Sequence, residues 1–254
     1  MKKNKINTKQ YIISYIDLLG VKEIIQKDKN NKFLNLLNDI YSKSIKEINK
    51  LSGENVRDKL NIKIFSDNII VAIPYSKFNL HMNFALITGI IGQIQLLFLS
   101  NGILMRGGIT IGNLYLNDIF VYGKGLSEAY FMESELAIYP RMILSSKLHK
   151  KIFNNDIRTI IFLINISYNI DFDGIYYLDF YRRATISQNK ISKVTISTIS
   201  SLLFKLKNKY NKQPKILQKL DWTIRYHNEF CQKYTNFYKY IIPLRNLSVY
   251  SEPK

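Results

Sequence analysis

Residues 60–74 read Leu60-Asn-Ile-Lys-Ile-Phe-Ser-Asp-Asn-Ile-Ile-Val-Ala-Ile-Pro74, two apolar runs that meet at Ser66, Asp67 and Asn68. The runs are rich in β-branched residues and the middle is rich in turn-forming residues, so the stretch predicts a β-hairpin with Asp67 at its tip. A carboxylate at such a tip can hold a metal ion. The alternative is an ordinary turn aspartate, which is a common feature of hairpins.

A second carboxylate follows an earlier apolar run. Residues Tyr11 to Ile16 predict a short strand that Asp17 closes, before Gly20 and a helical pattern. An acid at the end of an apolar strand is partly desolvated, and it stays ionised most easily beside a cation or hydrogen-bond donors. Two such acids on neighbouring strands would suit Mg²⁺ or Mn²⁺ together with a nucleoside triphosphate. The alternative for Asp17 is a helix N-cap.

Composition narrows the class of protein. The chain has 254 residues, of which 46% are hydrophobic, enough for a large core in one globular unit. Lys and Arg exceed Asp and Glu by 37 to 19, and the net charge of +18 attracts polyanions without choosing among nucleotides, nucleic acid and acidic membranes. Cys231 is the only cysteine, which excludes an intramolecular disulfide and fits a cytoplasmic protein. The apolar stretch Phe84–Leu99 contains two glutamines, so we expect a buried helix and no membrane insertion.

The first 150 residues alternate between strand and helix patterns, which predicts an α/β or α+β sandwich. After the hairpin come a helix, a strand, a second helix and a further strand, expected at 78–100, 103–113, 126–136 and 142–145. Arg106 lies in the 103–113 strand beside Gly107, Gly108 and Gly112. Glycines inside a strand often mark the close approach of a ligand or another backbone.

The last hundred residues carry fewer chemical signals. We expect strands at 159–166 and 175–180, then helices at 191–206 and 214–234. Asp171 and Asp173 could form a third metal site, but the Asp-Gly that ends their cluster favours a plain turn. Trp222, Tyr226 and Phe230 recur every four residues, which is typical of a packing face. The predicted organisation is a core at 1–150, with additional strands and C-terminal helices at 151–254 packed on it as one globular unit.

Several motifs in a fixed order carry a resemblance. The order is strand with Asp17, helix, hairpin with Asp67, helix, Arg106-Gly-Gly-Ile-Thr-Ile-Gly112, then a turn into Ala129-Tyr-Phe-Met-Glu133. It resembles the class III nucleotidyl cyclase catalytic domain over roughly residues 11–146. That resemblance implies a ferredoxin-like, palm-type core, with a mostly antiparallel sheet flanked by helices and a helical C-terminal extension. It also implies that Asp17 and Asp67 bind two Mg²⁺ or Mn²⁺ ions per active site. Arg106 would suit phosphate oxygens because its guanidinium gives a planar fork of donors, and the alternative for Arg106 is an ion pair at the surface or at a dimer interface.

A narrower resemblance rests on five segments: Ile16-Asp-Leu-Leu-Gly20, Phe65-Ser-Asp-Asn68, Gly102–Thr110, Tyr122–Leu126 and Tyr139–Ile143. These are similar to the pyrimidine cyclases of bacterial antiphage Pycsar systems. The segment Lys219–Asn228 is similar to that group as well. The implied activity converts UTP or CTP to the 3′,5′-cyclic monophosphate and pyrophosphate, as a signal that a separate effector reads. The implied partner is a second copy, because active sites in the family form at a homodimer interface.

The sequence departs from the purine cyclases at their specificity and transition-state positions. Their transition-state Asn and Arg would fall at Ser127 and Phe131, and their base-reading acid near Lys124. Adenylate cyclase activity is therefore disfavoured, whereas Lys124 or Lys63 could donate to the carbonyl oxygens of uracil or cytosine. The resemblance places a base-contacting lysine at Lys63, and Ser127 and Lys124 remain candidate substrate-binding residues.

Three rival readings remain open. A diguanylate cyclase or polymerase-like domain usually needs an acidic pair at the hairpin turn, whereas Ser66-Asp67-Asn68 offers one acid. A nucleic-acid-binding protein predicts basic and aromatic residues clustered on one face, whereas lysines here are spread along the chain. No specific nucleic acid is therefore expected. The third rival is a catalytically degenerate, cyclase-like regulatory domain.

Overall fold

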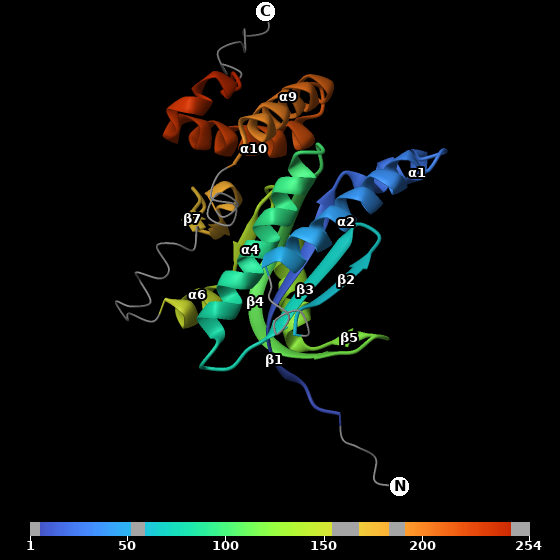
Figure 1. Cartoon of the computed structure of the whole chain (residues 1–254), viewed down its shortest axis with the longest axis vertical. Coiled ribbons are helices and arrows are strands. Elements are labelled where there is room, and N and C mark those ends of the chain that lie inside the picture. Colours follow the sequence, from blue (N-terminus) through green and yellow to red (C-terminus); the bar gives the residue numbers. More distant parts are fainter. Residues whose placement is uncertain (1–5, 52–58, 154–167, 183–190, 245–254) are drawn as a thin grey trace, which may run out of the picture. The chain divides into compact units, whose positions relative to one another are not determined.

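The computed structural model describes residues 6–51, 59–153, 168–182 and 191–244 (Figure 1). The chain forms two compact units, residues 1–191 and 192–254. The first unit contains every candidate site residue named above. The strand expected at 159–166 lies outside the described residues.

The first unit is built on one mixed sheet in the order β2-β3-β1-β4-β6-β8-β7, with the short strand β5 paired to β4. Neighbouring strands are antiparallel except for the parallel pair β4 and β6. The strands are β1 Lys9–Leu19, β2 Asn61–Phe65, β3 Asn68–Pro74, β4 Leu104–Leu116, β5 Val121–Tyr122, β6 Met142–Leu144, β7 Tyr168–Ile170 and β8 Tyr176–Leu178. The predicted α+β class with a mostly antiparallel sheet is confirmed.

Helices cover both faces of this sheet, because side chains alternate between the faces along each strand. Ile12, Ile16 and Leu18 of β1 belong to the main core, under α2 and α4. Ile13 points to the other face and packs with Ala129 of α5. The helices of this unit are α1 Val21–Lys27, α2 Lys32–Leu51, α4 Leu80–Leu99, α5 Lys124–Phe131 and α6 Ser146–Ile152, and α5 continues into the π-helix η1 Met132–Leu136.

Helix α4 is the predicted apolar helix. By length and composition it could cross a membrane, but 72% of its apolar window is buried inside the protein. Figure 1 shows it beside α2 over the strands. Such burial is typical of a core helix, which agrees with the expectation from the sequence. The two glutamines of the segment, Gln93 and Gln95, are buried as well.

The glycines of β4 allow close packing on both sides of the strand. A Cβ on Gly107 would clash with the carbonyl oxygen of Tyr15 and with the Met142 side chain. A Cβ on Gly108 would lie 2.8 Å from the carbonyl oxygen of Ala129 in α5. The predicted close approach therefore involves the protein's own backbone at these two positions.

The second unit contains two helices and a short 3₁₀ helix: α9 Lys193–Lys209, α10 Pro214–Lys233 and η2 Thr235–Tyr240. Ser192 caps α9 by accepting the N–H of Thr195 at 3.0 Å. The rings of Trp222 and Tyr226 stack with centroids 5.6 Å apart, and both side chains are buried. The aromatic stripe of α10 is therefore a packing face, as predicted.

Candidate active site

Asp17 lies in a row of polar residues that crosses three strands. In the register of the sheet it is opposite Asn68 of β3 on one side and Arg106 of β4 on the other. Because paired residues of adjacent strands project to the same face, Asp17 and Arg106 share the face that α5 covers. Strand β1 continues two residues beyond Asp17, so this carboxylate lies inside the strand and is not a helix N-cap.

Asp67 lies at the tip of the β2–β3 hairpin, as predicted. The preceding residue, Ser66, has a φ of 56°, in the left-handed region that tight hairpin turns require. The Asp67 carbonyl accepts the N–H of Leu18 at 2.8 Å, which fixes the tip against β1. The Asn68 side chain donates to the Asp67 carboxylate at 3.1 Å. The hairpin therefore holds the backbone of Asp67 beside Leu18, the residue that follows Asp17 in β1.

Arg106 connects Asp17 to an acid from the helical layer. Its Nε lies 3.4 Å from Asp17 Oδ2 and its Nη2 lies 2.8 Å from Glu133 Oε1, while Nη1 donates to the Ala137 carbonyl at 3.4 Å. The Glu133 side chain is only 5% exposed, and it comes from the π-helical turn η1. Irregular helical turns of this type are frequent at functional sites.

The pKa of Tyr15 is affected by its burial and by the negative charges of these acids. Burial raises the pKa of its phenol to about 12, and the nearby charges of Glu133, Asp17 and Asp67 act in the same direction. The ring of Tyr15 meets that of Tyr130 edge-on, with centroids 5.3 Å apart. The phenol is therefore neutral at physiological pH, and it lies within the electrostatic reach of all three carboxylates.

The donor set fits a magnesium or manganese ion that is completed by phosphate. Among the described residues no group of three or more His, Cys, Asp and Glu side chains could hold a metal ion. Asp17 and Asp67 could each supply a hard oxygen ligand, and Mg²⁺ is usually bound by one or two carboxylates with substrate phosphates and water. The Arg106 guanidinium already lies beside the Asp17 carboxylate, so a bound metal ion would contact the same carboxylate as Arg106.

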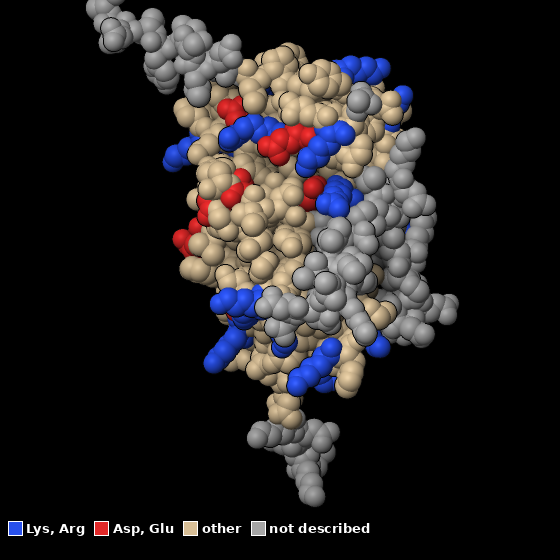
Figure 2. All heavy atoms as spheres, turned by 90° about the vertical axis from the view of Figure 1, so that its left-hand side faces the viewer, with Lys and Arg blue, Asp and Glu red and all other residues tan. Residues whose placement is uncertain are grey.

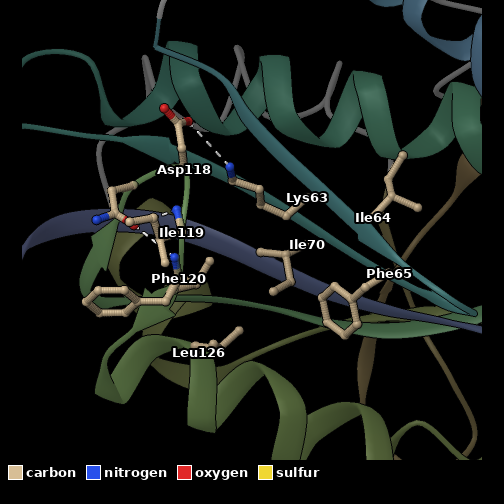
Figure 3. A pocket seen from close by; sticks show the side chains of 10 residues that line it. Lys63, Ile64, Phe65, Ile70, Asp118, Ile119, Phe120 and Leu126 are labelled. Carbon is tan, nitrogen blue, oxygen red and sulfur yellow. Dashed lines mark hydrogen bonds and ion pairs between the residues drawn. The ribbon is translucent and has the colours of Figure 1, made fainter.

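A separate pocket of about 350 Å³ opens between β2, the β4–β5 turn and α5. Lys63 lines it, and its ammonium lies 3.7 Å from the carboxylate of Asp118. Figure 3 shows these two side chains pointing toward one another across the pocket. The remaining lining is largely apolar: Ile64, Phe65, Ile70, Asn117, Ile119, Phe120, Val121 and Leu126.

The structure brings some of the predicted site residues together and leaves others apart. Asp17 and Arg106 contact one another at the end of β1, and the backbone of Asp67 lies beside Leu18 of the same strand. Lys63 lies in the pocket near the edge of the sheet. Lys124 and Ser127 are exposed on α5 and, among the described residues, belong to neither group.

The sequence did not predict the charged contacts of two arginines, Arg106 and Arg141. The Ala129–Glu133 motif located Glu133 without indicating that its carboxylate pairs with Arg106. Asp171 and Asp173, considered above as a metal site, instead bind the guanidinium of the buried Arg141. The favoured reading of their segment as a turn is correct, since it links β7 to β8. The sequence showed an arginine, Arg141, directly before an apolar segment that was expected to form a strand. Nothing local in the sequence identified its acidic partners.

Comparisons with known proteins gave likenesses at the level of structure. No family model matches the sequence, and no curated protein matches it. A crystal structure of the guanylyl cyclase Cya2 is 15% identical with a TM-score of 0.46, over 68% of this chain and 93% of that one. The monomeric guanylyl cyclase domain of a RhoGC fusion protein from the aquatic fungus Blastocladiella emersonii is 10% identical with a TM-score of 0.45, over 68% and 98%. An adenylate/guanylate cyclase/hydrolase from Silicibacter pomeroyi is 14% identical with a TM-score of 0.40, over 68% and 96%.

Proposed function

We propose that this chain is a class III-type nucleotidyl cyclase that converts UTP, or alternatively CTP, to the 3′,5′-cyclic monophosphate and pyrophosphate. The observation that carries the proposal is the polar row at the end of β1, in which Asp17 lies between the hairpin that presents Asp67 and the strand that presents Arg106. Two carboxylates and a guanidinium at one end of a sheet suit a triphosphate and its metal ions.

The polar residues near the end of β1 would have distinct roles in this reaction. Asp17 and Asp67 would hold two Mg²⁺ or Mn²⁺ ions, which on binding lower the pKa of the attacking 3′-hydroxyl and neutralise the departing pyrophosphate. Arg106 offers a planar fork of donors to phosphate oxygens, and Glu133 fixes the direction of that fork. The neutral phenol of Tyr15 offers a hydrogen-bond donor within the electrostatic reach of the carboxylates without adding charge.

The pocket at Lys63 supports a base-binding role. Its apolar walls suit a flat nucleobase, and the Lys63 ammonium can donate to a carbonyl oxygen of uracil or cytosine. Its volume of about 350 Å³ accommodates one such base together with water. Lys124 and Ser127, exposed on α5, would meet the substrate from a second copy of the chain.

A homodimer is part of the proposal because large apolar side chains are exposed around the pocket. Ile119 is 89% exposed, and Phe65, Phe120, Tyr130 and Phe131 are each about half exposed. Isolated exposed apolar residues are normal, but a group of this size on neighbouring elements is typical of an interface. The proposed physiological role is an antiphage second-messenger signal that a separate effector reads.

A direct assay tests the activity. The full chain is incubated with Mn²⁺ and each of the four ribonucleoside triphosphates, and products are identified by mass spectrometry. We expect cyclic UMP or cyclic CMP. Asp17→Asn and Asp67→Asn should each lower kcat/KM about a thousandfold, because several kcal/mol of transition-state stabilisation is lost. The control is Glu23→Gln, which changes an exposed acid of α1 and should leave the rate unchanged.

Two outcomes would count against the proposal. Full activity in Asp67→Asn would show that the hairpin acid is not a metal ligand. If none of the four triphosphates is cyclised, the alternative of a catalytically degenerate regulatory or nucleic-acid-binding protein is favoured. For nucleic acid, the face in Figure 2 shows Lys and Arg mixed with Asp and Glu and no continuous basic stripe among its described residues.

A further inference from the structure

Among the described residues of the first unit, Arg141 is the most deeply buried charge, and the proposed reaction does not use it. Its side chain is fully buried at the start of β6. Nη1 donates to Asp171 and, at 3.1 Å, to Asp173 Oδ1, while Nη2 donates to Asp173 Oδ2. A buried guanidinium is tolerated only when paired carboxylates satisfy it, and this one is paired with two.

The two acids are held rigidly by the turn between β7 and β8. Asp173 Oδ1 accepts the N–H of Ile175 at 3.2 Å, and the Asp171 carbonyl accepts the N–H of Gly174 at 2.9 Å. Burial acts to raise the pKa of Asp173, but the hydrogen bonds from Arg141 and Ile175 outweigh it, and the pKa is lowered. The turn of the β7–β8 hairpin therefore presents two ordered carboxylates to the Arg141 guanidinium.

The loop that ends at Arg141 also touches the candidate active site. The Arg141 carbonyl accepts the N–H of Gly107 at 3.1 Å, directly beside Arg106 in β4. The Ala137 carbonyl, at the other end of the loop, accepts from Arg106 Nη1 at 3.4 Å. Between them, the Tyr139 ring meets the Phe172 ring of the hairpin with centroids 5.5 Å apart.

We infer that Arg141 is a positioning residue for Arg106. The β7–β8 hairpin binds the Arg141 side chain, the loop 137–141 is thereby fixed, and the loop fixes both the backbone next to Arg106 and one nitrogen of its guanidinium. Asp171 and Asp173 thus affect the site indirectly, through the Arg141 guanidinium, instead of binding a metal ion. The relevance of Arg141 to catalysis rests on the proposed function, in which Arg106 contacts phosphate.

The geometry makes the role sensitive to shape as well as charge. Arg141→Lys keeps the positive charge, but an ammonium cannot reproduce the planar fork that binds Asp173 through two nitrogens. Asp173→Asn is the milder variant, because Asp173 is partly exposed and Asp171 still pairs with the guanidinium. The control is Lys150→Gln, which changes an exposed cation of α6.

The test on the full chain combines hydrogen exchange with steady-state kinetics. In Arg141→Lys we expect the amide of Gly107, read in peptides that cover 104–109, to exchange at least tenfold faster, while amides of α10 keep their rates. We expect KM for the nucleotide to rise about tenfold with kcat changed less than threefold. Asp173→Asn should show the same pattern more weakly, and Lys150→Gln should show neither change.

Hydrogen exchange tests the positioning role of Arg141, and the kinetics test its effect on the proposed reaction. Unchanged exchange over 104–109 in a folded Arg141→Lys or Asp173→Asn would overturn the inference, even if the melting temperature fell, since the cluster would then hold only its own hairpin. If Arg141→Lys does not fold, Asp173→Asn decides. If the wild-type chain cyclises no nucleotide, the exchange arm still decides whether Arg141 positions Arg106.

Discussion

The ion pair between Arg106 and Glu133 makes a quantitative prediction about stability. Glu133 is 5% exposed and Arg106 is 21% exposed, so Arg106→Ala leaves a nearly buried carboxylate without its guanidinium. Removal of one partner from a buried pair costs about 3–5 kcal/mol. Because solvent still reaches part of the Arg106 site, we expect the lower end of that range, about 3 kcal/mol.

The second variant separates the charge from the packing. Glu133→Gln keeps the side-chain shape and removes the charge, so in the Arg106→Ala background it should restore about 2 kcal/mol of the free energy of unfolding. The control is Arg225→Ala, which changes an exposed arginine of α10 and should alter stability by less than about 0.5 kcal/mol.

Urea denaturation at pH 7 and thermal melting measure these differences. A loss of about 3 kcal/mol corresponds to a fall of about 6–12 °C in the melting temperature for a unit of this size. A loss of less than about 1 kcal/mol in Arg106→Ala would contradict a stabilising role for this ion pair. A double variant that is no more stable than Arg106→Ala alone would show that the unpaired carboxylate is not the cause of the loss.

Two further predictions concern packing and pH. Gly108→Ala places a Cβ 2.8 Å from the Ala129 carbonyl and 2.5 Å from the Met132 Cβ, so we expect thermal melting to show a loss of about 1–3 kcal/mol; an unchanged melting temperature would mean that α5 shifts without cost. Burial lowers the pKa of His227 to about 4, below the ordinary value of 6.5, although a hydrogen bond to the Tyr240 carbonyl opposes the shift. The unfolded chain therefore binds the proton more tightly, and the second unit should lose up to about 3 kcal/mol as the pH falls from 6.5 to 4. His227→Gln should flatten that part of the denaturation profile, and an equal slope in the variant would contradict the assignment.

Local patterns determined most of the fold elements. The β-branched runs on both sides of Ser66-Asp67-Asn68 predicted the hairpin, which spans Asn61–Pro74. The long apolar run predicted α4, and the four-residue aromatic spacing predicted the packing face of α10. These succeed because turn chemistry and side-chain periodicity depend only on residues close in the sequence.

The charged contacts were decided by tertiary structure alone. Arg106 binds Asp17 across 89 residues, and Arg141 binds Asp171 and Asp173 across 30 and 32 residues. Which acid meets which arginine depends on strand order and register, since a slip of one residue would turn every side chain of a strand to the opposite face. The sequence by itself determined that Asp17 and Asp67 each stand at the end of an apolar run. Only the pairing of β1 with both β3 and β4 decided that Asp17 would lie between Asn68, the neighbour of Asp67, and Arg106.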